Sequence, residues 1–143
     1  MSTTNRQLYL YVHRVNDLES GVYRYCPPEG ELQQIKSGDQ RVAAAGLSLG
    51  QDLAGNACVA FSMVADLERA ARSDGDRGYR YAHFEAGAIG QRLYLAAEAL
   101  GLGATGIGAF FDDAVHDYLN LAAEQAVYHF AIGYPIPDPR IVA

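Results

Sequence analysis

The longest apolar pattern of the chain lies between Arg77 and Phe111. Over residues 79–100, apolar side chains occupy most of a helical circumference: Ala82, Ala86, Ile89, Leu93, Leu95, Ala96, Ala99 and Leu100. A helix with so little polar surface is typical of a protein interior. The pattern therefore predicts one long buried central helix from Tyr79 to Leu100, ended by Gly101 and Gly103.

Small residues stand out within this helix and after it. Gly87 and Gly90 remove side-chain bulk at a cost of about 1 kcal/mol each relative to alanine, which favours close approach of another helix or of a flat ligand. Tight packing inside the core is the simpler interpretation. After the helix, the sequence predicts a short buried strand that ends in the segment Gly106–Phe110.

Shorter patterns predict the remaining elements. Strands are expected at 8–15, 21–26 and 31–35 as an antiparallel meander, at 57–65 as a central strand buried on both faces, and at 127–133. Helices are expected at 40–49, at 67–72 with Asp66 as N-cap, and at 113–119 with Asp112 as N-cap. This order predicts a single α+β domain over residues 1–143, with a mixed or antiparallel sheet flanked by helices.

Composition excludes several classes of protein. The chain has 143 residues and a net charge of −6, and Lys36 is its single lysine. An acidic chain without a basic block is a poor candidate for nucleic-acid binding. No apolar run has the length of a membrane span, and the N-terminal residues lack the pattern of a signal peptide. Cys26 and Cys58 match no metal or redox spacing, so free thiols in a cytoplasmic protein are expected.

The chemistry-bearing residues form few motifs. No histidine stands near another histidine or a cysteine at ligand spacing, so a metal site is not expected. Four scattered histidines favour structural or surface roles, and two serines belong to no nucleophile motif: His13, His83, His116, His129, Ser62 and Ser73. GLGATG at 101–106 spells a dinucleotide fingerprint, but it follows a helix instead of a strand.

Two features remain as possible ligand contacts. Small residues in the segment Gly106–Phe110 would let backbone N–H groups face a ring nitrogen or an oxyanion, although a crowded strand end is an equally simple interpretation. Arg140 follows three prolines in an otherwise nearly uncharged tail. It is either a free surface charge or a residue that closes over an anion such as a phosphate.

Five motifs together resemble a known family. They are RGYRY at 77–81, EAG at 85–87, QRLYLAA at 91–97, ALGLG at 99–103 and GIGAFFDD at 106–113. This combination resembles the nitroreductase-like flavoproteins, and within them the SagB-type branch, the thiazole/oxazole-forming peptide dehydrogenases. The opening residues 9–35 are similar to the β-meander of that branch, so the resemblance spans about residues 8–135.

The resemblance implies an FMN-binding α+β fold, usually a homodimer with flavin at the subunit interface and hydride transfer through flavin N5. The named branch oxidises azolines to azoles in peptides, so the substrate would be a peptide or a small molecule. By position, Ile107, Gly108, Ala109 and Phe110 match the segment that lies against the flavin near N5. Arg140 matches a C-terminal basic residue on the FMN phosphate.

The chain also departs from the family pattern. An N-terminal segment with arginine and serine, which grips the FMN phosphate in relatives, is missing upstream of the first strand, where only Arg6 remains. A Lys-Tyr pair of the azoline-oxidising members is replaced by Ser73 and Asp74, which are poor proton shuttles there. Ala88 stands where the branch often has histidine.

These departures leave two main hypotheses about function. One is an FMN-dependent oxidoreductase whose missing phosphate contacts come from a dimer partner or from a second polypeptide. The other is a non-catalytic, flavin-poor relative that acts as a scaffold or partner subunit of a complete homologue. A flavin carrier without substrate chemistry is a third, weaker interpretation.

Overall fold

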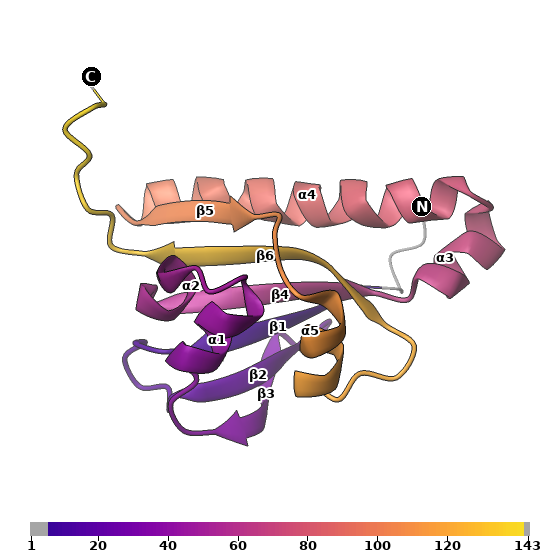
Figure 1. Cartoon of the computed structure of the whole chain (residues 1–143), viewed down its shortest axis with the longest axis horizontal. Helices are drawn as coiled ribbons and strands as arrows, with labels where there is room; N and C mark the ends of the chain where they lie inside the picture. Colours follow the sequence, from indigo (N-terminus) through magenta and orange to yellow (C-terminus); the bar gives the residue numbers. More distant parts are fainter. Residues whose placement is uncertain (1–5, 142–143) are drawn as a thin grey trace.

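The backbone forms a six-stranded sheet with helices on both faces, as shown by a computed structural model that describes residues 6–141 (Figure 1). The strands run in the order β3-β2-β1-β4-β6-β5, and every neighbouring pair is antiparallel. The strands are β1 (Arg6–Val12), β2 (Gly21–Cys26), β3 (Glu31–Ser37), β4 (Val59–Ala65), β5 (Gly103–Ile107) and β6 (Gln125–Gly133). The helices are α1 (Arg41–Leu47), α2 (Asp52–Asn56), α3 (Leu67–Asp74), α4 (Arg77–Ala99) and α5 (Asp112–Tyr118).

The α+β prediction is confirmed, including the N-terminal meander of β1, β2 and β3. Strand β4 lies between β1 and β6, and every residue after Val59 is buried. Its continuous apolar sequence fits this place, because successive side chains of a strand point to opposite faces and both faces of β4 are covered.

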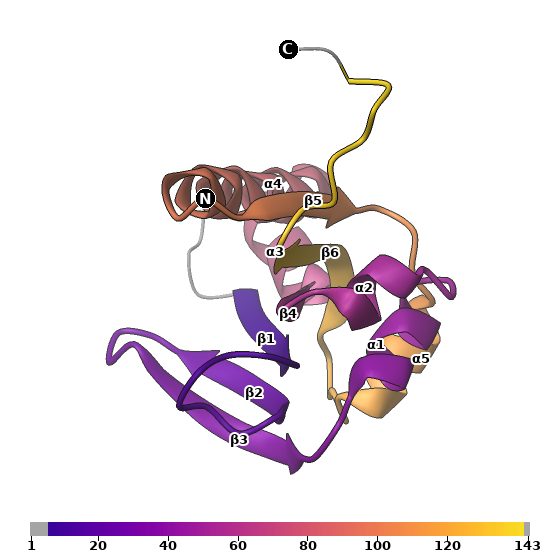
Figure 2. The same ribbon diagram turned by 90° about the vertical axis from the view of Figure 1, so that its left-hand side faces the viewer.

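The two faces of the sheet carry different helices (Figure 2). Phe61, Met63 and Phe130 belong to a cluster that includes Ala82 and Ala86 of α4. A second cluster on the opposite face joins Tyr11, Ala60 and Ala131 of the sheet to residues of α1, α2 and α5. The long helix therefore packs on one face, and the three short helices pack on the other.

Helix α4 begins two residues earlier than predicted and ends at the predicted glycine. Gly101 adopts a φ of 70°, which favours glycine. The N–H of Leu102 donates to Ala97 O at 2.8 Å, and the N–H of Gly101 donates to Glu98 O at 3.1 Å. These two bonds are the usual way in which a left-handed residue satisfies the last carbonyls of a helix.

Helix α4 is long, as predicted, but it is buried along one side only and not around most of its circumference. Ala82, Ala86 and Gly90 face the sheet, whereas Phe84 and Leu95 are 69% and 62% exposed. A helix can present only one stripe to a single sheet, so its other apolar residues face outward. A Cβ on Gly90 would lie 2.8 Å from a ring carbon of Tyr128, so this glycine allows close packing on β6.

Three further details differ from the sequence predictions. Strand β5 is an edge strand that ends at Ile107, because the chain turns away and the N–H of Phe111 bonds Leu47 O at 3.0 Å. The short helix α2 was not predicted. Asp66 caps α3 as expected by accepting from the N–H of Arg69, but α5 has no side-chain cap and Asp112 is its first residue.

Other predictions concern the ends of the chain and membranes. Residues 1–5, where the absence of a signal peptide was expected, lie outside the described residues. Among helices of the described part, none combines the length and apolar character needed to cross a bilayer.

Candidate functional site

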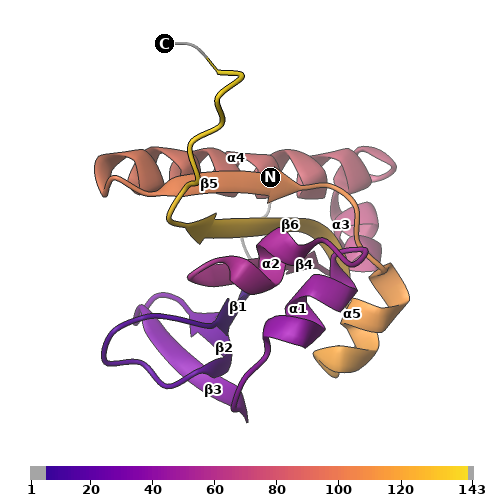
Figure 3. The same ribbon diagram turned by 60° about the vertical axis from the view of Figure 1, so that its left-hand side comes forward.

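The segment after β5, residues 108–111, forms a loop that we call the 108–111 loop. It passes the turn between α1 and α2 before it enters α5 (Figure 3). The side-chain amide of Gln51 donates to Ala109 O at 3.4 Å and to Ser48 O at 3.0 Å. Together with the bond from Phe111 to Leu47, these contacts fix the backbone of the loop against the α1–α2 turn.

The predicted ligand-facing residues Gly108 and Ala109 are open to solvent. A Cβ built on Gly108 would meet no atom within 4 Å, and Ala109 is exposed. Within residues 6–141, the N–H groups of Gly108 and Ala109 have no hydrogen-bond partner. Two free amides without side-chain bulk could donate to the edge of a flat ligand.

Gly106 has a different role from its neighbours. Its N–H already donates to the hydroxyl of Tyr94 at 2.6 Å. A Cβ at this position would overlap the hydroxyl of Tyr128, which occupies the space beside the glycine. Gly106 therefore serves packing between β5, β6 and α4, and the crowded-strand interpretation holds for this residue.

Ile107 and Phe110 anchor the two ends of the exposed stretch. The side chain of Ile107 is buried in the cluster below α1, α2 and α5. The ring of Phe110 stacks on the imidazole of His129, with centroids 4.5 Å apart and an interplanar angle of 19°. Any ligand contact of Ile107 must come from its backbone, whereas Phe110 also holds the loop on the sheet.

His129 belongs to a buried chain of polar groups. Its Nε2 lies 2.8 Å from Ser62 Oγ, and its Nδ1 lies 3.0 Å from Ser48 Oγ. The hydroxyl of Tyr11 lies 2.9 Å from Ser62 Oγ. Burial lowers the pKa of His129 to about 4 and raises the pKa of Tyr11. At neutral pH the imidazole is uncharged, so one ring nitrogen donates and the other accepts.

No motif or spacing in the sequence points to this chain of polar groups. Ser62 and His129 face each other across β4 and β6, which is a matter of strand register. A polar residue in the middle of each apolar strand was the signal that could have found them, because buried polar side chains need partners.

Arg140 is not brought to the 108–111 loop within one chain. Its guanidinium is 87% exposed and pairs with Asp138, with Nη2 2.6 Å from Oδ2, and this contact lowers the pKa of the Asp138 carboxyl. Gly133, at the end of β6, lies opposite Gly103, at the start of β5. The tail therefore leaves the sheet at the opposite end of β5 from the 108–111 loop (Figure 1). At roughly 3.3 Å per residue, the two ends of β5 lie about 13 Å apart.

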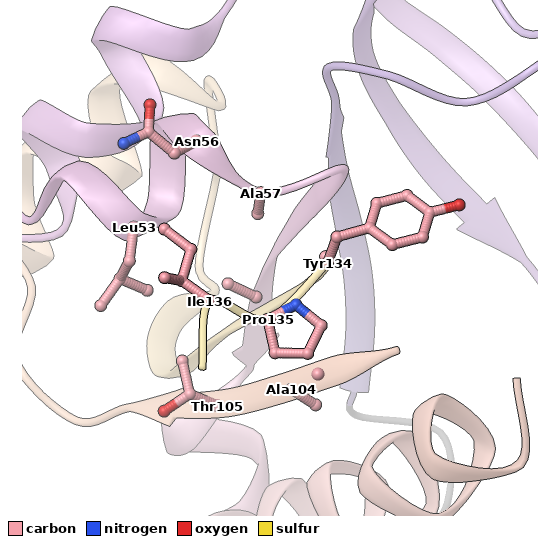
Figure 4. A pocket seen from close by; sticks show the side chains of 11 residues that line it. Leu53, Asn56, Ala57, Ala104, Thr105, Tyr134, Pro135 and Ile136 are labelled. Atoms are coloured by element: carbon pink, nitrogen blue, oxygen red, sulfur yellow. The ribbon is translucent and has the colours of Figure 1, made fainter. Parts of the chain in front are cut away.

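An open apolar pocket of about 430 Å³ lies at that other end of β5. Leu53 of α2, Thr105 of β5 and Ile136 of the tail extend toward it (Figure 4). Most of its lining is apolar, and Asn56 and Thr105 provide polar side chains. Among residues 6–141, no group of three or more histidine, cysteine, aspartate or glutamate side chains could hold a metal ion.

An antiparallel sheet with one long helix on a face, followed by a small-residue loop, is the fold of the nitroreductases. A crystal structure of a nitroreductase-named protein from Anabaena variabilis matches with a TM-score of 0.90 and 40% identity over 94% of this chain. A family model described as Nitroreductase family matches residues 2–134, and the chain belongs to this family.

Other relatives agree with this assignment. A Methanocaldococcus jannaschii protein named as a nitroreductase is 35% identical over 115 residues, which is 80% of this chain and 58% of that protein. The match to the Anabaena protein covers 28% of its chain. This chain thus spans little more than half of one relative and under a third of the other.

More distant structures share the fold alone. One is the Escherichia coli microcin synthetase complex McbBCD with truncated pro-MccB17, with a TM-score of 0.78 and 22% identity over 94% of this chain and 53% of that chain. Another is the NADPH:FMN oxidoreductase of Vibrio harveyi, with a TM-score of 0.60 and 22% identity over 73% of this chain and 49% of that chain.

Proposed function

We propose that the chain forms the flavin-contacting part of an FMN-dependent oxidoreductase of the nitroreductase family. The observation that carries this proposal is the pair of free, exposed amides at Gly108 and Ala109, on a loop whose backbone is fixed on both sides. Family membership supports a redox function, and the Vibrio harveyi relative is an FMN oxidoreductase by name.

The described residues fit an isoalloxazine ring at the loop. Gly108 leaves space for a flat ring, and the N–H groups of Gly108 and Ala109 are available to donate to its nitrogen-bearing edge. FMN bound there would supply hydride transfer at its atom N5. The loop would position that atom, and Phe110 and Ile107 would hold the loop.

A second copy of the chain would complete the site. The outer side of α4 exposes Phe84 and Leu95 at 69% and 62%, and a Cβ on Gly87 would meet nothing within 4 Å. Exposed apolar strips of this kind mark association surfaces. Since Arg140 lies far from the loop of its own chain, we propose that the partner's tail brings the phosphate contact in a homodimer.

The substrate is proposed from the resemblance. The SagB-type motifs favour a peptide or small-molecule substrate, and the McbBCD relative is itself a complex with a propeptide. Ser73 and Asp74 lie at the end of α3 where that branch has its Lys-Tyr pair. The loss of this pair is compatible with an alternative function, a non-catalytic partner subunit of a complete homologue. Failure of the protein to bind flavin would favour that alternative.

The Ala109→Leu variant tests the placement of the ring. A leucine side chain would occupy the space proposed for the ring and should weaken FMN binding about tenfold, which corresponds to about 1.4 kcal/mol. FMN titration followed by flavin fluorescence measures the affinity. The matched control is Ala122→Leu, at an exposed position in the α5–β6 connection. Equal affinity in both variants would place the ring elsewhere.

Protein concentration tests the role of the second copy. If two chains build the site, FMN occupancy should fall when the protein is diluted until it is monomeric in sedimentation or light scattering. Full occupancy in a strict monomer would contradict the shared site. A colourless protein that takes up no added FMN at any concentration would favour the partner-subunit function.

A further inference from the structure

We propose that His129 is a positioning residue for the flavin site: its buried imidazole is the fixed platform on which Phe110 stacks, and it thereby holds the amides of Gly108 and Ala109 in place. The ligand of these amides rests on the function proposed above. The platform itself is argued from the contacts of the described residues.

The imidazole is held from two directions. Ser62 of β4 contacts Nε2 at 2.8 Å, and Ser48, the residue after α1, contacts Nδ1 at 3.0 Å. A ring bonded at both nitrogens cannot turn about its Cβ–Cγ bond without losing a hydrogen bond, whereas a phenylalanine ring has no such bonds to lose. The plane presented to Phe110 is therefore fixed.

The same serine connects this platform to the backbone of the loop. Ser48 follows Leu47, whose carbonyl accepts from the N–H of Phe111 at 3.0 Å. Phe110, the neighbour of Phe111, stacks on the ring that Ser48 bonds. The loop is therefore held in two ways. Its backbone bonds Leu47 through Phe111, and its side chain Phe110 stacks on His129, which bonds the neighbouring Ser48.

Core packing alone does not account for a histidine at this position. His129, Ser62, Ser48 and Tyr11 are 3%, 0%, 2% and 2% exposed. Burying such groups is costly unless each finds a partner, and a leucine would fill space without that requirement. A fully bonded polar chain instead specifies a single arrangement. Phe110 is the element of the proposed site that contacts this arrangement.

A double-mutant cycle tests the platform with holo-protein. His129→Leu and Phe110→Leu should each weaken FMN affinity about tenfold and alter the visible circular dichroism of bound FMN, because the amides lose their fixed position. The double variant should be no weaker than either single variant, because both remove the same contact. If the losses of FMN affinity in the two single variants added up in the double variant, the proposal would be overturned.

Two further variants separate positioning from stability. Phe61→Leu, on the opposite face, should lower the unfolding temperature yet leave FMN affinity and the dichroism unchanged. Phe110→Tyr keeps a flat ring and should retain wild-type affinity. If His129→Leu does not fold, Ser48→Ala replaces it and should weaken FMN binding about threefold. An effect of Phe61→Leu as large as that of the platform variants would overturn the proposal.

Hydrogen exchange distinguishes this inference from the proposed function. If the wild-type protein binds no FMN, the proposed function fails. The platform is then tested by exchange of the Phe111 amide, which donates to Leu47 O and should exchange faster in His129→Leu and in Phe110→Leu but not in Phe61→Leu. Exchange that is equal in all three variants would overturn the positioning role.

Discussion

The two faces of the sheet are built from different chemistry. The face toward α4 is packed with apolar side chains such as Phe61, Met63 and Phe130, and Gly90 lets the helix approach. The face toward α1, α2 and α5 contains apolar residues too, but Ser62 and His129 stand at its centre. The 108–111 loop lies on this second face, against the α1–α2 turn.

This difference separates stability from positioning. Apolar burial stabilises in proportion to area and tolerates small shifts, because contacts between apolar atoms have no preferred direction. A buried hydrogen-bonded chain contributes less to stability, but it fixes the orientation of its members. The α4 face is therefore held by apolar packing, whereas the opposite face adds to its apolar cluster a polar chain that determines where the 108–111 loop lies.

The largest effect is expected on the apolar face. Phe130 is fully buried and its ring contacts those of Phe61, Tyr94 and Tyr128, so Phe130→Ala should lower the free energy of unfolding by about 3–5 kcal/mol. Urea unfolding measures this change. Phe84→Ala, at a 69% exposed position of α4, is the control and should cost less than about 1 kcal/mol in the monomer. Similar losses of unfolding free energy in Phe130→Ala and Phe84→Ala would show that the apolar face of the sheet is not a main source of stability.

The polar face should make stability depend on pH. Burial lowers the pKa of His129 from 6.5 to about 4, so below pH 6.5 the unfolded chain binds a proton that the folded chain does not. The free energy of unfolding should therefore fall by about 1.4 kcal/mol per pH unit between these values. Above pH 6.5 this residue adds no pH dependence.

Urea unfolding of wild type and of His129→Leu, from neutral pH down to about pH 4.5, isolates this contribution. The carboxylates and His13, whose pKa is also lowered by burial, are present in both proteins, so the difference between the two curves reports His129. If the free energy of unfolding depended on pH equally in both proteins, the imidazole would not be buried in its neutral form.

The smallest effect concerns one hydroxyl. Tyr11→Phe removes the partner of Ser62 Oγ at the end of the polar chain and should cost about 1 kcal/mol, the usual net contribution of a hydrogen bond. Tyr25→Phe on β2 is the matched control, because Tyr25 is 38% exposed, and its stability should be unchanged. A loss above that of Phe130→Ala would reverse the ranking of the two faces.

The sequence predicts the apolar face better than the polar one. Helix α4 and strand β4 have long, continuous patterns, and Gly101 marks the end of the helix, so hydrophobic periodicity and a glycine stop are sufficient. The resemblance placed Gly108 and Ala109, and the structure leaves both open to a ligand. Their contact with FMN stays a prediction.

The contacts of the polar face depend on features that no local pattern carries. Ser62 meets His129 only in one register of β4 and β6, next to an irregularity between Met63 and Val64. The α1–α2 turn needs a left-handed Leu49, with a φ of 56°, a conformation that sequence propensity disfavours. The place of Arg140 depends on a second chain in our proposal, so one sequence cannot fix it.

The hydroxyl of Tyr94 has a consequence for assembly. It accepts a hydrogen bond from the N–H of Gly106 in the edge strand β5, on the side away from β6. An exposed edge amide is a template for strand addition from another molecule. Because a side chain of α4 caps this donor near the end of β5, an incoming strand would have to break an existing hydrogen bond. Addition of a strand at Gly106 is thereby disfavoured.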